Sequence, residues 1–220
     1  METFNKKNLD QLDFLKNNES ANNQINKASL EVNNQKVKAQ KDKGIEKILI
    51  LDTETTGLDE SKEEVIEIGC ILFHVGSKSV LSQASFLLPV SKNDAAHING
   101  INSDISNIPQ PWEKGMDFFL SLVDSCDLII AHNVEFDKKW FGRGRLPLLR
   151  KKWLCSLEDI NWSFKKSLKS RPSVTDLALS FGVPVWNLHR ALSDCFYLSE
   201  IFKRCENLEE LLLKATEPRY

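Results

Sequence analysis

The chain has 220 residues, of which 41% are hydrophobic and 27% charged, and its formal net charge is −2. This composition is ordinary for a soluble globular protein, and the length gives room for one sizeable core, or one domain with a tail. No signal peptide is evident, and no apolar stretch approaches the roughly 20 residues that span a bilayer, so we expect a cytoplasmic protein without membrane attachment. The five scattered cysteines contain no Cys-x-x-Cys pair, which favours reduced, buried thiols over disulfides or a zinc site.

The first 44 residues are crowded with Asn, Lys and Gln. Ala21, Ile25, Ala28 and Val32 follow one another at helical spacing, but such a thin apolar stripe rarely makes a stable helix without a partner. We therefore expect residues 1–44 to form a disordered or loosely helical arm, with room for a protein partner that docks through it.

From residue 45 onwards, strand and helix patterns alternate. We expect strands over residues 48–51, 64–75, 80–90, 127–131 and 153–156, with a short turn at 76–79. We expect a loop over 91–111 and helices over 112–123, 135–149, 174–181 and 189–205. Three antiparallel strands followed by β-α-β predict an α/β fold, with a mixed sheet flanked by helices.

Two acidic residues follow the first buried strand. Side chains alternate faces along a strand, so Asp52 and Glu54 point to the same side. Carboxylates this close repel each other unless a proton or a cation lies between them, and clustered oxygen ligands suit Mg²⁺ or Mn²⁺. The pattern is weak by itself, because a cap at the end of the strand would also explain it.

Further candidates lie at the starts of two later helices. Asp137 would sit in the first turn of a helix for which Asn133 is a plausible N-cap, where the helix dipole alone could explain the acid. His189 and Asp194 are five residues apart, so the histidine can approach the same ligand as Asp194 only from the loop before the helix. A histidine in such a loop suits a general base, although surface or capping roles are common for it.

The charge distribution is asymmetric. Between Lys138 and Arg171 there are eleven basic residues and only two acidic ones, Glu158 and Asp159. A segment this basic in an acidic chain suggests a polyanion partner, with a solvated surface as the alternative. Bases of a nucleic acid could stack on aromatic residues in or near the segment. These are Trp140, Phe141, Trp153, Trp162, Phe164 and Trp186.

Three motifs occur in a fixed order: Asp-Thr-Glu-Thr-Thr-Gly-Leu at 52–58, Ala-His-Asn-x-x-Phe-Asp at 131–137 and His-Arg-Ala-x-x-Asp at 189–194. With them, the chain from 45 to 205 resembles the DEDDh 3′–5′ exonucleases, the DnaQ-like family of the proofreading subunit of bacterial replicative DNA polymerase and of ribonuclease T. The resemblance implies a ribonuclease H-like fold with a five-stranded mixed sheet. It places the exonuclease domain at 45–206 and leaves 207–220 as a C-terminal tail.

The resemblance also assigns roles to the acidic residues and the histidine. It implies that Asp52, Glu54, Asp137 and Asp194 hold two Mg²⁺ or Mn²⁺ ions, and that His189 takes the proton from the attacking water. Two such ions can generate a hydroxide and stabilise the leaving 3′ oxygen of a phosphodiester.

The resemblance further implies contacts with the terminal nucleotide. They would come from Thr55, Gly57, Leu58, His97, Ile101 and Asn133. Residues 98–101 are similar to the Ile-His-Gly-Ile element of the family, with Asn99 where the family often has His and with His97 just before the element.

The implied activity is metal-dependent release of nucleoside 5′-monophosphates from the 3′ end of single-stranded nucleic acid, with DNA and RNA both open. Stand-alone relatives often form homodimers, so a homodimer is also open. A catalytically silent nucleic-acid-binding module is the alternative, and its usual mark, a lost carboxylate or histidine, is absent here. A hydrolase of very short oligonucleotides or other small phosphoesters is a third reading.

Overall fold

A computed structural model describes residues 44–164, 168–186 and 189–216 of the chain. The expected arm at 1–44, with its loose helix and docking partner, lies outside the described residues except for Gly44. Among the described residues, none of the helices has the length and apolarity that a membrane span requires. All five cysteines are buried and none forms a disulfide, as we predicted.

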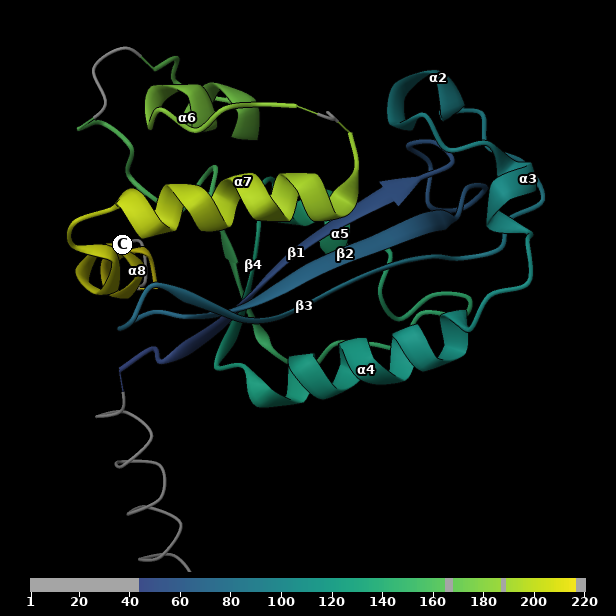
Figure 1. Cartoon of the computed structure of the whole chain (residues 1–220), viewed down its shortest axis with the longest axis horizontal. Coiled ribbons are helices and arrows are strands. Elements are labelled where there is room, and N and C mark those ends of the chain that lie inside the picture. The colour runs from purple at the N-terminus through teal and green to yellow at the C-terminus, as the bar shows by residue number, and fades with distance from the viewer. Residues whose placement is uncertain (1–43, 165–167, 187–188, 217–220) are drawn as a thin grey trace, which may run out of the picture. The chain divides into compact units, whose positions relative to one another are not determined.

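Five strands form one mixed sheet in the order β3-β2-β1-β4-β5 (Figure 1). The strands are β1 Lys47–Thr55, β2 Val65–His74, β3 Ser79–Leu87, β4 Leu128–Ala131 and β5 Lys152–Cys155. The first three pair antiparallel, whereas β4 runs parallel to both β1 and β5. The expected α/β fold, a mixed five-stranded sheet flanked by helices, is confirmed.

Helices cover both faces of the sheet. They are α2 Ala96–Asn99, α3 Ser103–Ser106, α4 Trp112–Ser125, α5 Val134–Lys138, α6 Val174–Ser180, α7 Ala191–Arg204 and α8 Leu208–Ala215. Alternate residues of β1 serve the two faces: Ile48 and Ile50 pack with α6, α7 and α8, while Leu49 and Leu51 pack with α4. Figure 1 shows α7 and α4 on opposite sides of the sheet. The face that carries α7 is therefore also the face to which Asp52 and Glu54 belong.

Two local expectations were wrong. The helix expected over 135–149 ends at Lys138, because the chain turns at Gly142 and Gly144, both of which have positive φ values of 89° and 53°. The expected loop over 91–111 contains the single-turn helices α2 and α3. The second of these begins where the side chain of Asn102 accepts a hydrogen bond from the backbone of Asp104.

The segments just before and just after the last long helix also differ from expectation. Helix α7 begins at Ala191, so His189 lies in the loop before it, with a φ of 58°. The segment after 206, expected to be a tail, forms α8, whose Leu208 and Leu212 are buried in the core beneath α7. The amphipathic spacing of these leucines explains the difference, since it gives the segment a face to bury.

Helix α7 approaches strand β2 very closely at Gly69. A Cβ atom on Gly69 would lie 2.3 Å from the backbone nitrogen of Leu192 and 2.4 Å from the carbonyl carbon of Ala191. The Sγ atom of Cys195 lies 3.3 Å from the Gly69 carbonyl oxygen, its hydrogen-bond acceptor. Glycine is therefore required at this position, because any side chain would push the first turn of α7 away from the sheet.

We predict that Gly69→Ala destabilises the protein by about 1–3 kcal/mol, because the added methyl group overlaps backbone atoms that cannot rotate away. Urea unfolding measures the effect. Gly76→Ala is the matched control, since its Cβ would meet no atom closer than 3.5 Å. Equal unfolding midpoints for the two variants would contradict the close approach.

Candidate metal and active site

Three carboxylates meet at the exit of β1. Asp52 and Glu54 project from the end of the strand, and Asp194 reaches them from the first turn of α7. One carboxylate oxygen of each residue lies within 4.8 Å of the other two. Three oxygen ligands at this spacing suit a hard divalent cation such as Mg²⁺ or Mn²⁺.

A fourth carboxylate, that of Asp137 on α5, is buried beside the end of the same strand. Its Oδ1 atom accepts hydrogen bonds from Thr53, from the backbone nitrogen at 2.9 Å and from Oγ1 at 2.8 Å. Its Oδ2 atom is buried and has no hydrogen-bond partner among the described residues. Because an unpaired buried oxygen is unfavourable, this atom fits a cation ligand better than a merely structural acid.

The four acids raise one another's pKa values. Burial first, and then the neighbouring carboxylates, raises the pKa of Asp52 well above its ordinary value. Burial and then the charge of Asp194 raise the pKa of Glu54 to about 8. Burial raises the pKa of Asp137 to about 7 against the two hydrogen bonds from Thr53, which lower it. Without a cation the cluster therefore holds protons near neutral pH, and a divalent cation would replace them.

His189 lies on the solvent side of this cluster. It is exposed, has a left-handed backbone conformation and lies two positions before the first residue of α7. Burial raises the pKa of Asp194 to about 6, and the charge of the nearby His189 opposes this rise. The histidine thus approaches Asp194 from the loop, as the five-residue spacing requires.

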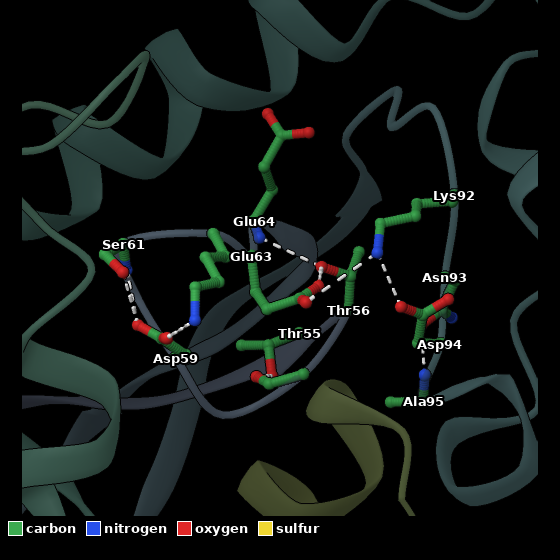
Figure 2. Close-up of polar contacts among 12 residues, drawn as sticks. Thr55, Thr56, Asp59, Ser61, Glu63, Glu64, Lys92, Asn93, Asp94 and Ala95 are labelled. Carbon is green, nitrogen blue, oxygen red and sulfur yellow. Dashed lines mark hydrogen bonds and ion pairs between the residues drawn. The ribbon is translucent and has the colours of Figure 1, made fainter.

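The turn after β1 is held in a hydrogen-bonded frame (Figure 2). The hydroxyl of Thr56 donates to Glu63 Oε2 at 2.5 Å and accepts from the backbone nitrogen of Glu64 at 3.0 Å. Figure 2 shows Lys92 between Glu63 and Asp94, with its Nζ atom 2.6 Å from Asp94 Oδ2. This frame fixes the loop that carries the predicted nucleotide contacts.

The first three predicted contact residues lie in this turn. The hydroxyl of Thr55 donates to the carbonyl of Gly57 at 2.7 Å, and a Cβ on Gly57 would meet Glu63 at 2.9 Å. The next side chain, Leu58, is 76% exposed. An apolar side chain held out to solvent by a rigid turn is well placed to contact a base.

The element at 98–101 has a different arrangement from the one predicted. Ile101 is buried with Ile66 and Val90, so its side chain supports the element from below. Ile98, the first residue of the element, is 52% exposed. His97 is exposed as well, and its Nδ1 atom lies 3.2 Å from the carbonyl oxygen of Asp94.

Hydrogen bonds of the Asn99 side chain hold this element next to the site. Its amide group donates to the carbonyl of Thr55 at 3.1 Å and accepts from Asn93 at 2.9 Å and from the backbone of Ile101 at 3.1 Å. The residue is buried, and it ties the element to the end of β1.

The second motif contains one residue whose side chain differs from expectation and one for which no role was predicted. Asn133 occupies the N-cap position of α5 with a φ of 68°, but its side chain makes no capping hydrogen bond and is exposed. Its neighbour His132, which we did not predict, lies 2.9 Å from Ser156 Oγ through Nδ1 and 2.9 Å from the Pro172 carbonyl through Nε2. His132 therefore links the end of β4 to Ser156, just after β5, and to Pro172, just before α6.

The basic segment divides into tethered and free side chains. Several cations bind nearby groups: Lys139 donates to the Leu58 carbonyl, Lys151 to the Asp124 and Cys126 carbonyls, and Lys152 to the Thr216 carbonyl, while Arg145 pairs with Glu64 and Arg171 with Glu158. Within the described part of the basic segment, four exposed cations have no hydrogen-bond or ion-pair partner. These are Lys138, Arg143, Arg150 and Lys169. They remain available to a polyanion.

The aromatic residues of this region divide in the same way. Trp140, Phe141 and Trp162 are buried and Trp153 is partly buried against the core, whereas Phe164 and Trp186 are each 54% exposed. Only the last two present enough ring surface for a base to stack on them.

Comparisons with known proteins agree with this architecture. The exonuclease family model RNase_T matches residues 49–202. The chain is 29% identical over 160 residues to the DNA polymerase III subunit epsilon of Treponema pallidum (strain Nichols), a match that covers 69% of this chain and 72% of that protein. The chain is also 27% identical over 160 residues to the PolC-type DNA polymerase III of Thermotoga petrophila. That match covers 71% of this chain but only 12% of the polymerase.

Solved structures show the same fold. Exonuclease X in complex with 5′ overhanging duplex DNA superposes with a TM-score of 0.55 at 21% identity, covering 77% of this chain and 99% of that one. The nuclease domain of 3′hExo, a DEDDh family member bound to rAMP, gives a TM-score of 0.58 at 18% identity, with 73% and 91% covered.

The mixed sheet and the acidic cluster at the exit of β1 define a nuclease domain with the ribonuclease H-like fold. The chain belongs to the exonuclease family, among the DnaQ-like DEDDh exonucleases.

The raised pKa values predict an unusual dependence of stability on pH. In the metal-free folded state Glu54 and Asp137 bind protons that the unfolded chain has already lost, so the free energy of unfolding should fall as pH rises from about 6.5 to about 8. The partly buried His132, whose pKa is lowered by desolvation, acts in the opposite direction, but only below its ordinary value near 6.5. Melting temperatures measured in EDTA across this window test the prediction.

Glu54→Gln tests the cause, because it removes the group with a pKa of about 8 and should make the slope above pH 7 less steep. Mn²⁺ should raise the melting temperature more at pH 8 than at pH 6.5, since fewer protons then compete with the ion. A melting temperature in EDTA that is flat or rising between pH 6.5 and 8 would contradict the account.

Proposed function

We propose that this protein is a metal-dependent 3′–5′ exonuclease that releases nucleoside 5′-monophosphates from the 3′ end of single-stranded DNA or RNA. The observation that carries the proposal is the convergence of Asp52, Glu54 and Asp194 within 4.8 Å, next to the unpartnered Oδ2 atom of Asp137. The proposed catalytic domain runs from residue 45 through α8, whose leucines complete its core.

The four carboxylates would hold the divalent ions and His189 would handle the proton. Two divalent ions, when bound, would activate the attacking water and stabilise the leaving 3′ oxygen. Asp52, whose pKa is raised by burial and by the charges of Asp137, Asp194 and Glu54, would hold the ions together with these three carboxylates. The exposed His189, held beside Asp194, would accept the proton of the water and pass it to solvent.

The turn after β1 would bind the terminal nucleotide. Thr55 and Gly57 would offer backbone contacts, and the exposed Leu58 and Ile98 would pack against the bases. Asn133 and His97 are exposed at the same edge of the domain and would add polar contacts. Exonuclease X in a complex with DNA and 3′hExo bound to rAMP show that this fold accommodates both sugars in other proteins, so both substrates need testing.

The strand upstream of the terminal nucleotide would follow the free cations of the basic segment. Lys138, Arg143 and Arg150 would contact phosphates, which predicts binding that weakens as salt increases. The exposed rings of Phe164 and Trp186 are the candidates for base stacking.

We predict that 5′-labelled single-stranded oligonucleotides shorten stepwise from the 3′ end in Mg²⁺ or Mn²⁺ but not in EDTA. Asp52→Asn should abolish the ladder while the metal-free fold remains at least as stable, because the substitution removes one of the repelling carboxylates. His189→Ala should slow the chemical step by about 10²–10⁴-fold and leave oligonucleotide binding unchanged.

His74→Ala is the matched control for the histidine variant. His74 lies at the far end of β2, where its Nδ1 atom contacts Ser77, so its removal should leave the rate unchanged. Near wild-type cleavage by Asp52→Asn would refute the proposed metal site. Salt-sensitive binding without any ladder in either metal would instead identify a catalytically silent nucleic-acid-binding module.

A further inference from the structure

A fifth carboxylate lies next to the proposed metal ligands but is fully occupied by other partners. Glu67 on β2 is buried and stands directly opposite Glu54 in the antiparallel register. Its Oε1 atom accepts from Arg190 Nη2 at 2.8 Å and from Ser85 Oγ at 2.9 Å. Its Oε2 atom accepts from Arg190 Nε at 2.9 Å and from the backbone nitrogen of Ala191 at 3.1 Å.

This set of bonds caps α7 from a neighbouring strand. The first N–H groups of a helix have no partner within the helix, and Arg190, at the N-cap position, offers no side-chain cap. Glu67 supplies the missing acceptor at Ala191, and its negative charge lies at the positive end of the helix dipole. The start of α7 is thereby fixed to β2 by a backbone hydrogen bond and a bidentate ion pair.

Gly69 completes the docking two residues further along the same face of β2. Its missing side chain allows the backbone of Ala191 and Leu192 to rest directly on the strand. Asp194 follows Ala191 by three residues, so its position relative to Asp52 and Glu54 depends on this contact. His189 immediately precedes Arg190, so the same contact also limits where the histidine can lie.

The ion pair also engages both oxygens of a carboxylate that lies opposite a proposed metal ligand. An ionised Glu67 opposite Glu54 would repel it and offer a competing ligand to the ion. The guanidinium of Arg190 occupies both oxygens in the planar, two-bond geometry that lysine cannot reproduce.

We propose that Glu67 and Arg190 are positioning residues that hold the first turn of α7 so that Asp194 completes the metal site with Asp52 and Glu54. The proposal rests on the proposed function, because it assumes that these carboxylates bind divalent ions. It assigns the arginine of the third motif to ligand placement, with no contact to substrate.

The test measures Mn²⁺ binding to the metal-free protein by isothermal titration calorimetry, which does not depend on cleavage. Glu67→Gln/Arg190→Gln removes both charges together, so that no unpaired ion is left buried in the variant. Misplaced metal ligands typically weaken affinity by about 10–100-fold, and we expect a loss in this range. Circular dichroism and urea unfolding verify that the variant is folded.

Two further variants separate positioning from general effects. Arg190→Lys keeps the charge but loses the two-bond geometry, and it should recover little of the lost Mn²⁺ affinity. Glu200→Gln/Arg204→Gln removes an ion pair from the other end of the same helix, with an N–O distance of 2.6 Å, and should bind Mn²⁺ as the wild type does. In cleavage assays, the Glu67/Arg190 variants should lose kcat at saturating Mn²⁺ while KM for the oligonucleotide stays unchanged.

The possible results separate a failure of the positioning role from a failure of the proposed function. If the wild type binds Mn²⁺ and the Glu67/Arg190 double variant binds it equally well, the positioning role is refuted and the proposed function survives. If Arg190→Lys binds as tightly as the wild type, charge alone suffices and the positioning role is again refuted. If the wild type binds no Mn²⁺, the proposed function falls and the positioning role falls with it.

Discussion

The main constraint on this structure is the electrostatic repulsion between carboxylates that lie close together at one point. Four carboxylates gather at the exit of β1, and burial together with their mutual repulsion holds their pKa values well above those of free side chains. Such a cluster is unfavourable in the folded state unless protons or cations neutralise it. The rest of the domain supplies the rigidity that keeps the four groups together despite that repulsion.

That rigidity comes from the way three elements meet. Strand β1 lies in the middle of the sheet, where its apolar residues are buried on both faces and fix the direction of Asp52 and Glu54. Helix α5 brings Asp137 against the backbone of Thr53. Helix α7 brings Asp194 through close packing on β2. The four carboxylates are thus attached to three elements of one core, and loss of any of these contacts would relax the cluster and weaken its affinity for a cation.

The fold and the acidic residues could be predicted because both depend on short-range patterns. Alternation along β1 placed Asp52 and Glu54 on one face, and the helix-start motif placed Asp137 in a first turn. The prediction of a helix over 135–149 was wrong because it relied on the apolar periodicity of the segment and gave too little weight to the turns at Gly142 and Gly144. Other features depend on contacts between segments far apart in the chain, which no local pattern encodes. Such features include the burial of Ile101, the bridging by Asn99 and His132, and the docking of α7 on Gly69.

The measurement that tests the central claim most directly is anomalous diffraction from crystals of the protein soaked in Mn²⁺. The account predicts one strong peak between Asp52, Glu54 and Asp194 and a second beside the Oδ2 atom of Asp137. In the same crystals, the carboxylate of Glu67 should remain bound to Arg190 and take no part in coordination. Absence of a peak at the exit of β1, with the four carboxylates ordered and in their present positions, would contradict it.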